Sequence, residues 1–213
     1  MIALTMNPVY IKEVLKLHGA DAYPCVEGRV DMKEIRVGKS RLQFLVGDIT
    51  AQDTEAVVNA ANKQLAPGGG VAGAIHRAAG PGLWEECKKL GGCETGEAKI
   101  SSGHNLPNKY VVHTVGPVYS GSKSDALLLR ACYINSLKVA DKHGISSISF
   151  PALSTGIFGY PVDKAAYVAI KAVKEYLEGE TGIKVVRMVL YDEGSYREHL
   201  RALDAVDSGV DIS

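Results

Sequence analysis

VVNAANKQLAPGGGVAGAIH, from Val57 to His76, joins the end of an apolar strand to two asparagines, three consecutive glycines and a helical pattern. Gly68, Gly70 and Gly73 have the spacing G-x-G-x-x-G, which is the dinucleotide fingerprint of a Rossmann fold. A Rossmann turn, however, passes directly from strand to helix, and its unit usually starts the domain. Here NAANKQLAP intervenes between strand and glycines, and two expected strands come earlier. A nicotinamide-dependent oxidoreductase is therefore disfavoured.

The three glycines still need a physical reason, because consecutive glycines lose much backbone entropy on folding. They suit a loop whose main-chain N–H groups approach a ligand closely. The following VAGAIHRAAG begins a helix, with Val71, Ile75 and Ala78 on one face. Loop N–H groups beside a helix N-terminus form an anion site. The alternative for this stretch alone is a flexible surface loop.

A second glycine stretch, SFPALSTGIFGYP (residues 149–161), also follows an expected strand and precedes a helix. It is not G-x-S-x-G, because Pro151 and Ala152 stand where the first glycine would be, so a hydrolase elbow is disfavoured. The P-loop pattern G-x-x-x-x-G-K-[ST] does not occur in the chain. Two glycine loops at strand ends suggest two walls around one diphosphate.

Apolar patterning predicts strands in KEIRVG, RLQFLVG, EAVVNA, GEAKISSG, KYVVHTVG, SSISFPAL and KVVRMVLYD. It predicts helices over residues 8–18, 71–79, 82–90, 123–143, 162–178 and 194–205. Strands separated by helices imply an α/β fold, a largely parallel sheet with helices on both faces. Ligands of such sheets bind in loops at the carboxyl ends of the strands. We expect one domain over residues 31–213, with residues 1–30 as an N-terminal appendage.

The chain has 213 residues, and its 24 basic side chains balance its 24 acidic ones. General nucleic-acid binding is therefore not expected. No apolar run approaches a membrane span, and MIALTMNPVY lacks the features of a signal peptide. The four cysteines are scattered and none has zinc-ligand spacing, so we interpret them as reduced packing residues in a cytoplasmic protein. No motif requires a metal or a cofactor.

Several long motifs, in this order, resemble the macro domain family. They run from GDIT (residues 47–50) through VVNAAN, GGGVAGAIHRAAGP, GEAKISSGHNLPNKYVVHTVGP and FPALSTGIFGYP to VLYDEG, and span about residues 42–205. The GAIHRAAGP and GEAKI to HTVGP stretches look most like the MacroD-type branch. The resemblance implies a three-layer α/β/α domain, with a mixed, largely parallel central sheet and a site for ADP-ribose.

The resemblance also implies roles for individual residues. Asp48 would accept a hydrogen bond from the adenine amino group, with support from the Ile49 backbone, although Asp48 capping the next segment with Thr50 stays an alternative. Asn62 would orient the distal ribose, and Tyr191 would stack on or edge the adenine. One wall of the diphosphate and distal ribose would be Gly68, Gly69, Gly70 and Val71, and the other Ser154, Thr155, Gly156, Ile157 and Phe158. Asn62, Gly70 and Gly156 would take part in catalysis, whereas Asn59 would brace the loop. We interpret His76 and His113 as structural, because each lies inside a regular apolar element.

One difference from the MacroD-type motif bears on whether the chain is an enzyme. MacroD-type hydrolases have a motif similar to GGGGVDG in the first loop, and its Asp helps orient or activate the attacking water. This chain has Ala72 at that position. Other macro domains carry GGGVAG, and some of them still cleave ADP-ribose from acidic side chains. The resemblance thus implies a monomeric ADP-ribosyl hydrolase that acts on mono-ADP-ribosylated proteins, and possible deacetylation of O-acetyl-ADP-ribose. The alternative is a non-catalytic module that only binds ADP-ribosyl groups.

Overall fold

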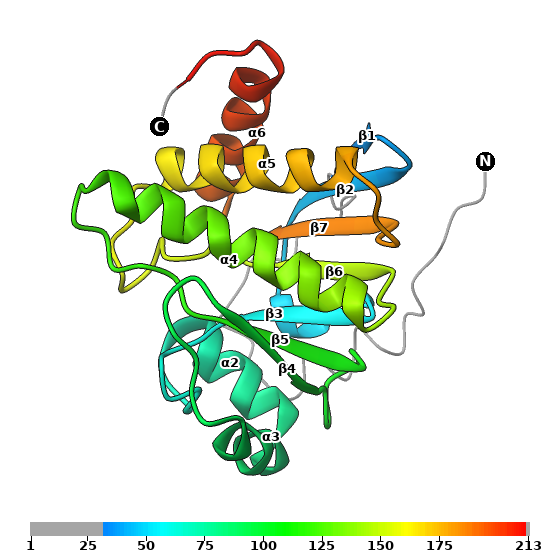
Figure 1. Ribbon diagram of the computed structural model, residues 1–213, viewed down its shortest axis with the longest axis vertical. Helices are drawn as coiled ribbons and strands as arrows, with labels where there is room; N and C mark the ends of the chain where they lie inside the picture. Colours follow the sequence, from blue (N-terminus) through cyan, green and yellow to red (C-terminus); the bar gives the residue numbers. More distant parts are fainter. Residues whose placement is uncertain (1–31, 212–213) are drawn as a thin grey trace, which may run out of the picture. The chain divides into compact units, whose positions relative to one another are not determined.

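The computed structural model describes residues 32–211 (Figure 1). The predicted N-terminal appendage and the helix expected over residues 8–18 lie outside the described residues. The described chain forms one seven-stranded sheet with helices on both faces, so the expected α/β class with a mixed, largely parallel sheet is confirmed.

The sheet has the strand order β1-β2-β7-β6-β3-β5-β4. The five inner strands pair in parallel, and each edge strand is antiparallel to its neighbour. The strands are β1 (Lys33–Val37), β2 (Ser40–Val46), β3 (Ala56–Ala60), β4 (Ala98–Ser102), β5 (Tyr110–Thr114), β6 (Ser147–Phe150) and β7 (Val185–Leu190). All five parallel strands therefore end at the same edge of the sheet.

One face of the sheet is covered by three helices. They are α4 (Lys123–Lys142), α5 (Val162–Glu178) and α6 (Glu193–Asp207). Figure 1 shows one of them, α4, passing in front of the strands. Strand residues alternate between faces, so Val58 of β3 packs under these helices whereas its neighbour Val57 faces the other side. This side holds the larger of the two apolar clusters.

The opposite face is covered by shorter elements: η1 (Ile49–Ala51), α2 (Gly70–Ala79), α3 (Pro81–Cys87) and η2 (Lys88–Leu90). Residues 82–90 were expected to form one helix, but the α-helix ends at Cys87 and a 3-10 turn follows. The turn runs into Gly91 and Gly92, which both have positive φ, and a left-handed backbone ends a helix.

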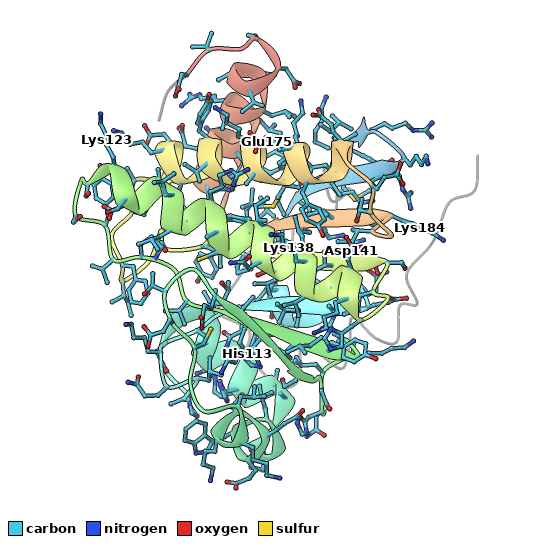
Figure 2. The ribbon with its side chains drawn as sticks, in the orientation of Figure 1. His113, Lys123, Lys138, Asp141, Glu175 and Lys184 are labelled. Carbon is cyan, nitrogen blue, oxygen red and sulfur yellow. The ribbon has the colours of Figure 1, made fainter. Side chains whose placement is uncertain are left out.

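Local side chains fix where the long helices begin. Ser122 accepts from Ser124 N and forms a capping box with Asp125 at the start of α4. Asp192 accepts from Ser195 N at 2.7 Å at the start of α6. At the far end of α4, Asp141 (labelled in Figure 2) accepts from the Tyr176 hydroxyl at 2.6 Å and ties α4 to α5. The caps at Ser122 and Asp192 fix where the loops after β5 and β7 end.

Candidate functional site

The residues predicted for the site lie in loops that follow four parallel strands. Asp48 and Ile49 come after β2, Asn62 and the three glycines after β3, residues 154–158 after β6, and Tyr191 after β7. These strands are neighbours in the order β2, β7, β6, β3, so the loops meet at one edge of the sheet. This is the edge at which open α/β sheets bind ligands.

The first glycine loop, residues 61–70, connects β3 to α2. Gly69 caps α2 without a side chain, and Gly70 begins the helix with a φ of +55°, a conformation that favours glycine. Gly68, Gly69 and Gly70 are all exposed. The N–H groups of the first turn of α2 therefore lie beside exposed glycine backbone, which is the arrangement that binds anions.

Two contacts hold this loop in place. Asn62 Nδ2 donates to Ala66 O at 2.9 Å, and Ala66 N donates to Asn62 Oδ1 at 2.9 Å. In addition, a Cβ on Gly73 of α2 would lie 2.3 Å from Gly68 O, so the helix packs directly against the loop backbone. Asn62 thus braces the loop, a role that we had predicted for Asn59.

The second glycine loop, residues 151–161, connects β6 to α5. Two backbone bonds fold it: Tyr160 N donates to Ser154 O at 3.0 Å, and Gly159 N donates to Gly156 O at 2.9 Å. Ser154 has a φ of +65°, which is uncommon for a residue other than glycine. Gly156, in contrast, has an ordinary φ, and a Cβ there would meet no protein atom within 4 Å. The protein itself therefore does not require glycine at position 156.

The loop that follows β5 supports the second glycine loop. Tyr119 N donates to Phe158 O at 2.9 Å, and the Tyr119 and Tyr160 rings lie 4.7 Å apart. A Cβ on Gly116 would lie 2.1 Å from Ser154 Oγ, so a larger residue there would require the Ser154 side chain to move. The sequence motif HTVGP contains Gly116, but it does not indicate this role, because the close partner Ser154 is far away in the chain.

The two glycine loops come together at Ile157. Its side chain is 87% exposed, yet a Cβ on Gly69 would lie only 3.5 Å from Ile157 Cδ1. An exposed apolar side chain at the tip of one loop thus reaches the glycines of the other. The structure thus brings the tip of the second glycine loop next to the first glycine loop.

Asp48 and Tyr191 come directly after the adjacent strands β2 and β7. The ends of these strands are joined by a bond from Gly47 N to Leu190 O at 2.9 Å. Asp48 Oδ1 accepts from Thr50 N and from Thr50 Oγ1, each at 2.8 Å. The capping alternative is therefore seen in the structure. Over residues 32–211, no group bonds to Asp48 Oδ2, so capping leaves one carboxylate oxygen for a ligand. The Tyr191 side chain is 81% exposed.

His113 of β5, labelled in Figure 2, is buried on the α2 and α3 face of the sheet. Asn59 Nδ2 lies 3.1 Å from its Nδ1, and Ser101 Oγ lies 2.8 Å from its Nε2. The amide can only donate to Nδ1, so Nε2 carries the proton and the ring is neutral. Burial lowers the pKa of His113 to about 3, which keeps the ring neutral at physiological pH. Its role is structural, as we expected.

Ala72, which stands where the MacroD-type motif has an Asp, lies in the first turn of α2. It is 5% exposed, and a Cβ on Gly68 would lie 3.9 Å from its own Cβ. The first turn of α2 thus presents a methyl group to the glycine loop at this position. The neighbouring His76 is also buried, and burial lowers its pKa.

Cys87, Cys93 and Cys132 are free and buried, and burial raises the pKa of each thiol. Within residues 32–211, no three His, Cys, Asp or Glu side chains are placed to hold a metal ion. None of the helices described is both long and apolar enough to cross a membrane.

Residues 58–169 match the family described as Macro domain. The chain belongs to the macro domain family. A macro domain-containing protein of Methanosarcina mazei is 49% identical over 167 residues, which are 78% of this chain and 89% of that protein. The ADP-ribose glycohydrolase MACROD1 of Bos taurus is also 49% identical over 167 residues, which are 75% of this chain but only 51% of that protein.

The solved structures agree with this assignment. The macrodomain of Oceanobacillus iheyensis with ADP is similar to this macro domain with a TM-score of 0.82 at 36% identity. The match covers 86% of this chain and 100% of that chain. The family and its fold, both expected from the motifs, are therefore confirmed.

Proposed function

We propose that this macro domain binds ADP-ribose and removes mono-ADP-ribose from acidic side chains of modified proteins. The observation that carries the proposal is the meeting of two glycine loops at Gly69 and Ile157, at the carboxyl edge of the sheet. Exposed backbone N–H groups on facing loops suit a diphosphate. The similarity to a protein named ADP-ribose glycohydrolase supports the same ligand.

The adenine end of the ligand is assigned to β2 and β7. Asp48 has one carboxylate oxygen for the purine amino group, and the Ile49 backbone supports the same ring. Tyr191, which is largely exposed, offers a ring that stacks on or edges the base. The glycine loops then hold the diphosphate and the distal ribose, with Val71 and Thr155 among the residues that line them.

The proposed chemistry is hydrolysis of an ester at the anomeric carbon. A water oxygen attacks that carbon, the bond from the carbon to the carboxylate oxygen breaks, and the acceptor carboxylate leaves. The water releases one proton, and the products are ADP-ribose and a free acidic side chain. The bound diphosphate polarises the water, while Gly70 and Gly156 allow the substrate to bend toward it. Asn62 orients the distal ribose in the same step. Bound O-acetyl-ADP-ribose presents a similar ester.

A second function, an ADP-ribosyl-binding module without turnover, is favoured by one observation. Ala72 places a methyl group where the MacroD-type motif has an Asp. Loss of a positioned general base lowers the rate of a catalysed reaction by about 10²–10⁴. A substrate-assisted mechanism needs no such base, so the hydrolase remains the preferred function.

A single-turnover assay separates the two functions. The substrate is a protein mono-ADP-ribosylated on glutamate or aspartate, and the measurement is release of ADP-ribose. The hydrolase predicts release by the wild type and its loss in Gly156→Glu, which places a carboxylate at the open position in the second glycine loop. Binding of free ADP-ribose with no release by the wild type would establish the binding module instead.

A further inference from the structure

A partly buried network of polar side chains lies on the sheet beside the turn that carries Asp48. At its centre is Arg187 of β7, which stands directly opposite Gln43 of β2 in the register of the sheet. The neighbouring Val189 belongs to the apolar cluster on the α2 side, and alternation puts Arg187 on that same face. The Arg187 side chain is only 16% exposed, so its charge needs close partners.

Three acceptors surround the guanidinium group of Arg187. Nε donates to Gln43 Oε1 at 2.9 Å, and Nη1 donates to Gln52 Oε1 at 3.0 Å and to Asp53 Oδ1 at 2.6 Å. Gln43 is itself fixed by a bond from its Nε2 to Glu34 Oε2 at 2.6 Å. The guanidinium group is planar and rigid, so these bonds fix the position of Gln52 Oε1.

Gln52 passes this constraint to the turn. An arginine can only donate, so the oxygen of the Gln52 amide must face Arg187 and its nitrogen must face the other way. That nitrogen, Nε2, donates to Asp48 O at 2.6 Å. The backbone of Gln52 is held as well, because its own carbonyl accepts from Asn108 Nδ2 at 3.0 Å. Gln52 is buried, so water competes little for these bonds.

The Asp48 side chain needs such a constraint, because it is exposed and its carboxylate bonds only within its own short turn. A contact to a ligand is strong only when the protein group is already held in the bound position. We infer that Gln52, oriented by Arg187, is a positioning residue that fixes Asp48 for recognition of the purine amino group. This inference rests on the proposed binding of ADP-ribose.

The test measures selectivity for the amino group. Calorimetry gives Kd for ADP-ribose and for its purine-riboside analogue, in which hydrogen replaces the 6-amino group. Gln52→Glu keeps an oxygen for Arg187 but cannot donate to Asp48 O. Gln52→Met removes the donor without adding a charge. Asp53→Asn is the matched control, because it alters another acceptor of Arg187 and has no bond to Asp48.

We expect the wild type to prefer ADP-ribose by about tenfold or more, the value of a hydrogen bond to a charged group. Both Gln52 variants should reduce that preference by about three- to tenfold, whereas Asp53→Asn should retain it. A structural role alone would lower the melting temperature but leave the ratio of the two Kd values unchanged.

Three results would overturn the inference. If the folded Gln52 variants keep the wild-type ratio, Asp48 is fixed without Gln52. If the wild type binds both ligands equally, Asp48 does not recognise the amino group, although ADP-ribose binding stands. If the wild type binds neither ligand, the proposed function fails together with the inference.

Discussion

Substitution of glycine by alanine should lower stability at Gly73 but not at Gly156. In Gly73→Ala, the new methyl group would lie 2.3 Å from Gly68 O and 2.9 Å from Arg77 Nη1. The arginine tip can move, but the carbonyl belongs to a loop that Asn62 braces. Alanine gains about 1 kcal/mol in helix propensity, whereas overpacking costs about 1–3 kcal/mol. Because the contact is so short, we expect the upper part of that range and a net loss of about 1–2 kcal/mol.

Gly156→Ala meets no atom within 4 Å and has an ordinary φ. It should therefore leave stability unchanged or raise it by about 0.4–1 kcal/mol, because alanine restricts the unfolded chain. If the second glycine loop is a wall of the ligand site, ADP-ribose binding should nevertheless weaken. Gly73→Ala should lose both stability and binding, because it displaces the first glycine loop.

Thermal unfolding and calorimetry with ADP-ribose measure both effects. A loss of 1–2 kcal/mol corresponds to a fall of about 2–8 °C in Tm for a domain of this size. A Gly73→Ala protein that melts at or above the wild-type temperature and binds normally would refute the packing of α2 against the loop. Normal binding by Gly156→Ala would remove the second glycine loop from the site.

Three further predictions concern the site and the core. Asp48→Ala should weaken ADP-ribose binding by roughly one to two decades. Asp48→Asn can still cap Thr50 and should retain the turn. Calorimetry on the two variants therefore separates capping from recognition of the ligand. Ala72→Asp should speed the release of ADP-ribose in the single-turnover assay without tightening binding. Because the new carboxylate is buried, the variant should be less stable in urea. Slower release would show that Ala72 belongs to a complete substrate-assisted site. Burial lowers the pKa of His113 to about 3, and that of His199, a buried residue of α6, to about 4. Below about pH 6.5 the unfolded chain therefore binds more protons than the folded chain. The free energy of unfolding should thus fall as the pH drops from 6.5 toward 4. Urea titrations should show a shallower fall for His199→Gln, and an identical slope would exclude His199 as a contributor.

Local signals in the sequence predicted the elements well where the deciding groups are close in the chain. The helix expected over residues 123–143 is found at Lys123–Lys142, because the Ser122 and Asp125 capping box and one apolar face define it. The strand order was beyond such signals. Nothing local to VVRMVL indicates that β7 lies between β2 and β6, since its partners are about 40 and 140 residues away.

The same distinction applies to the site. The glycine stretches and their places after strands could be read from the sequence, because backbone conformation follows from residue type. The side-chain partners could not. Arg187 and Gln52 are 135 positions apart, and Ser154 and Gly116 meet only in the folded sheet. Asn62 shows a related limit, because the resemblance implied a contact with the distal ribose but nothing in the sequence indicated its two bonds to Ala66.

The place of β7 in the sheet has a consequence for synthesis of the chain. It is the last of the strands described to leave the ribosome, yet it separates β2 from β6. Until about residue 190 has emerged, the hairpin of β1 and β2 has no link to the rest of the sheet through strand pairing. A nascent chain can thus form both glycine loops while Asp48 is still unplaced, and its two half-sheets expose unpaired strand edges that invite aggregation. Pairing of β7 with β2 and β6 closes these edges and brings Arg187 to Gln52. The network that we infer to position Asp48 therefore forms only once the sheet is complete.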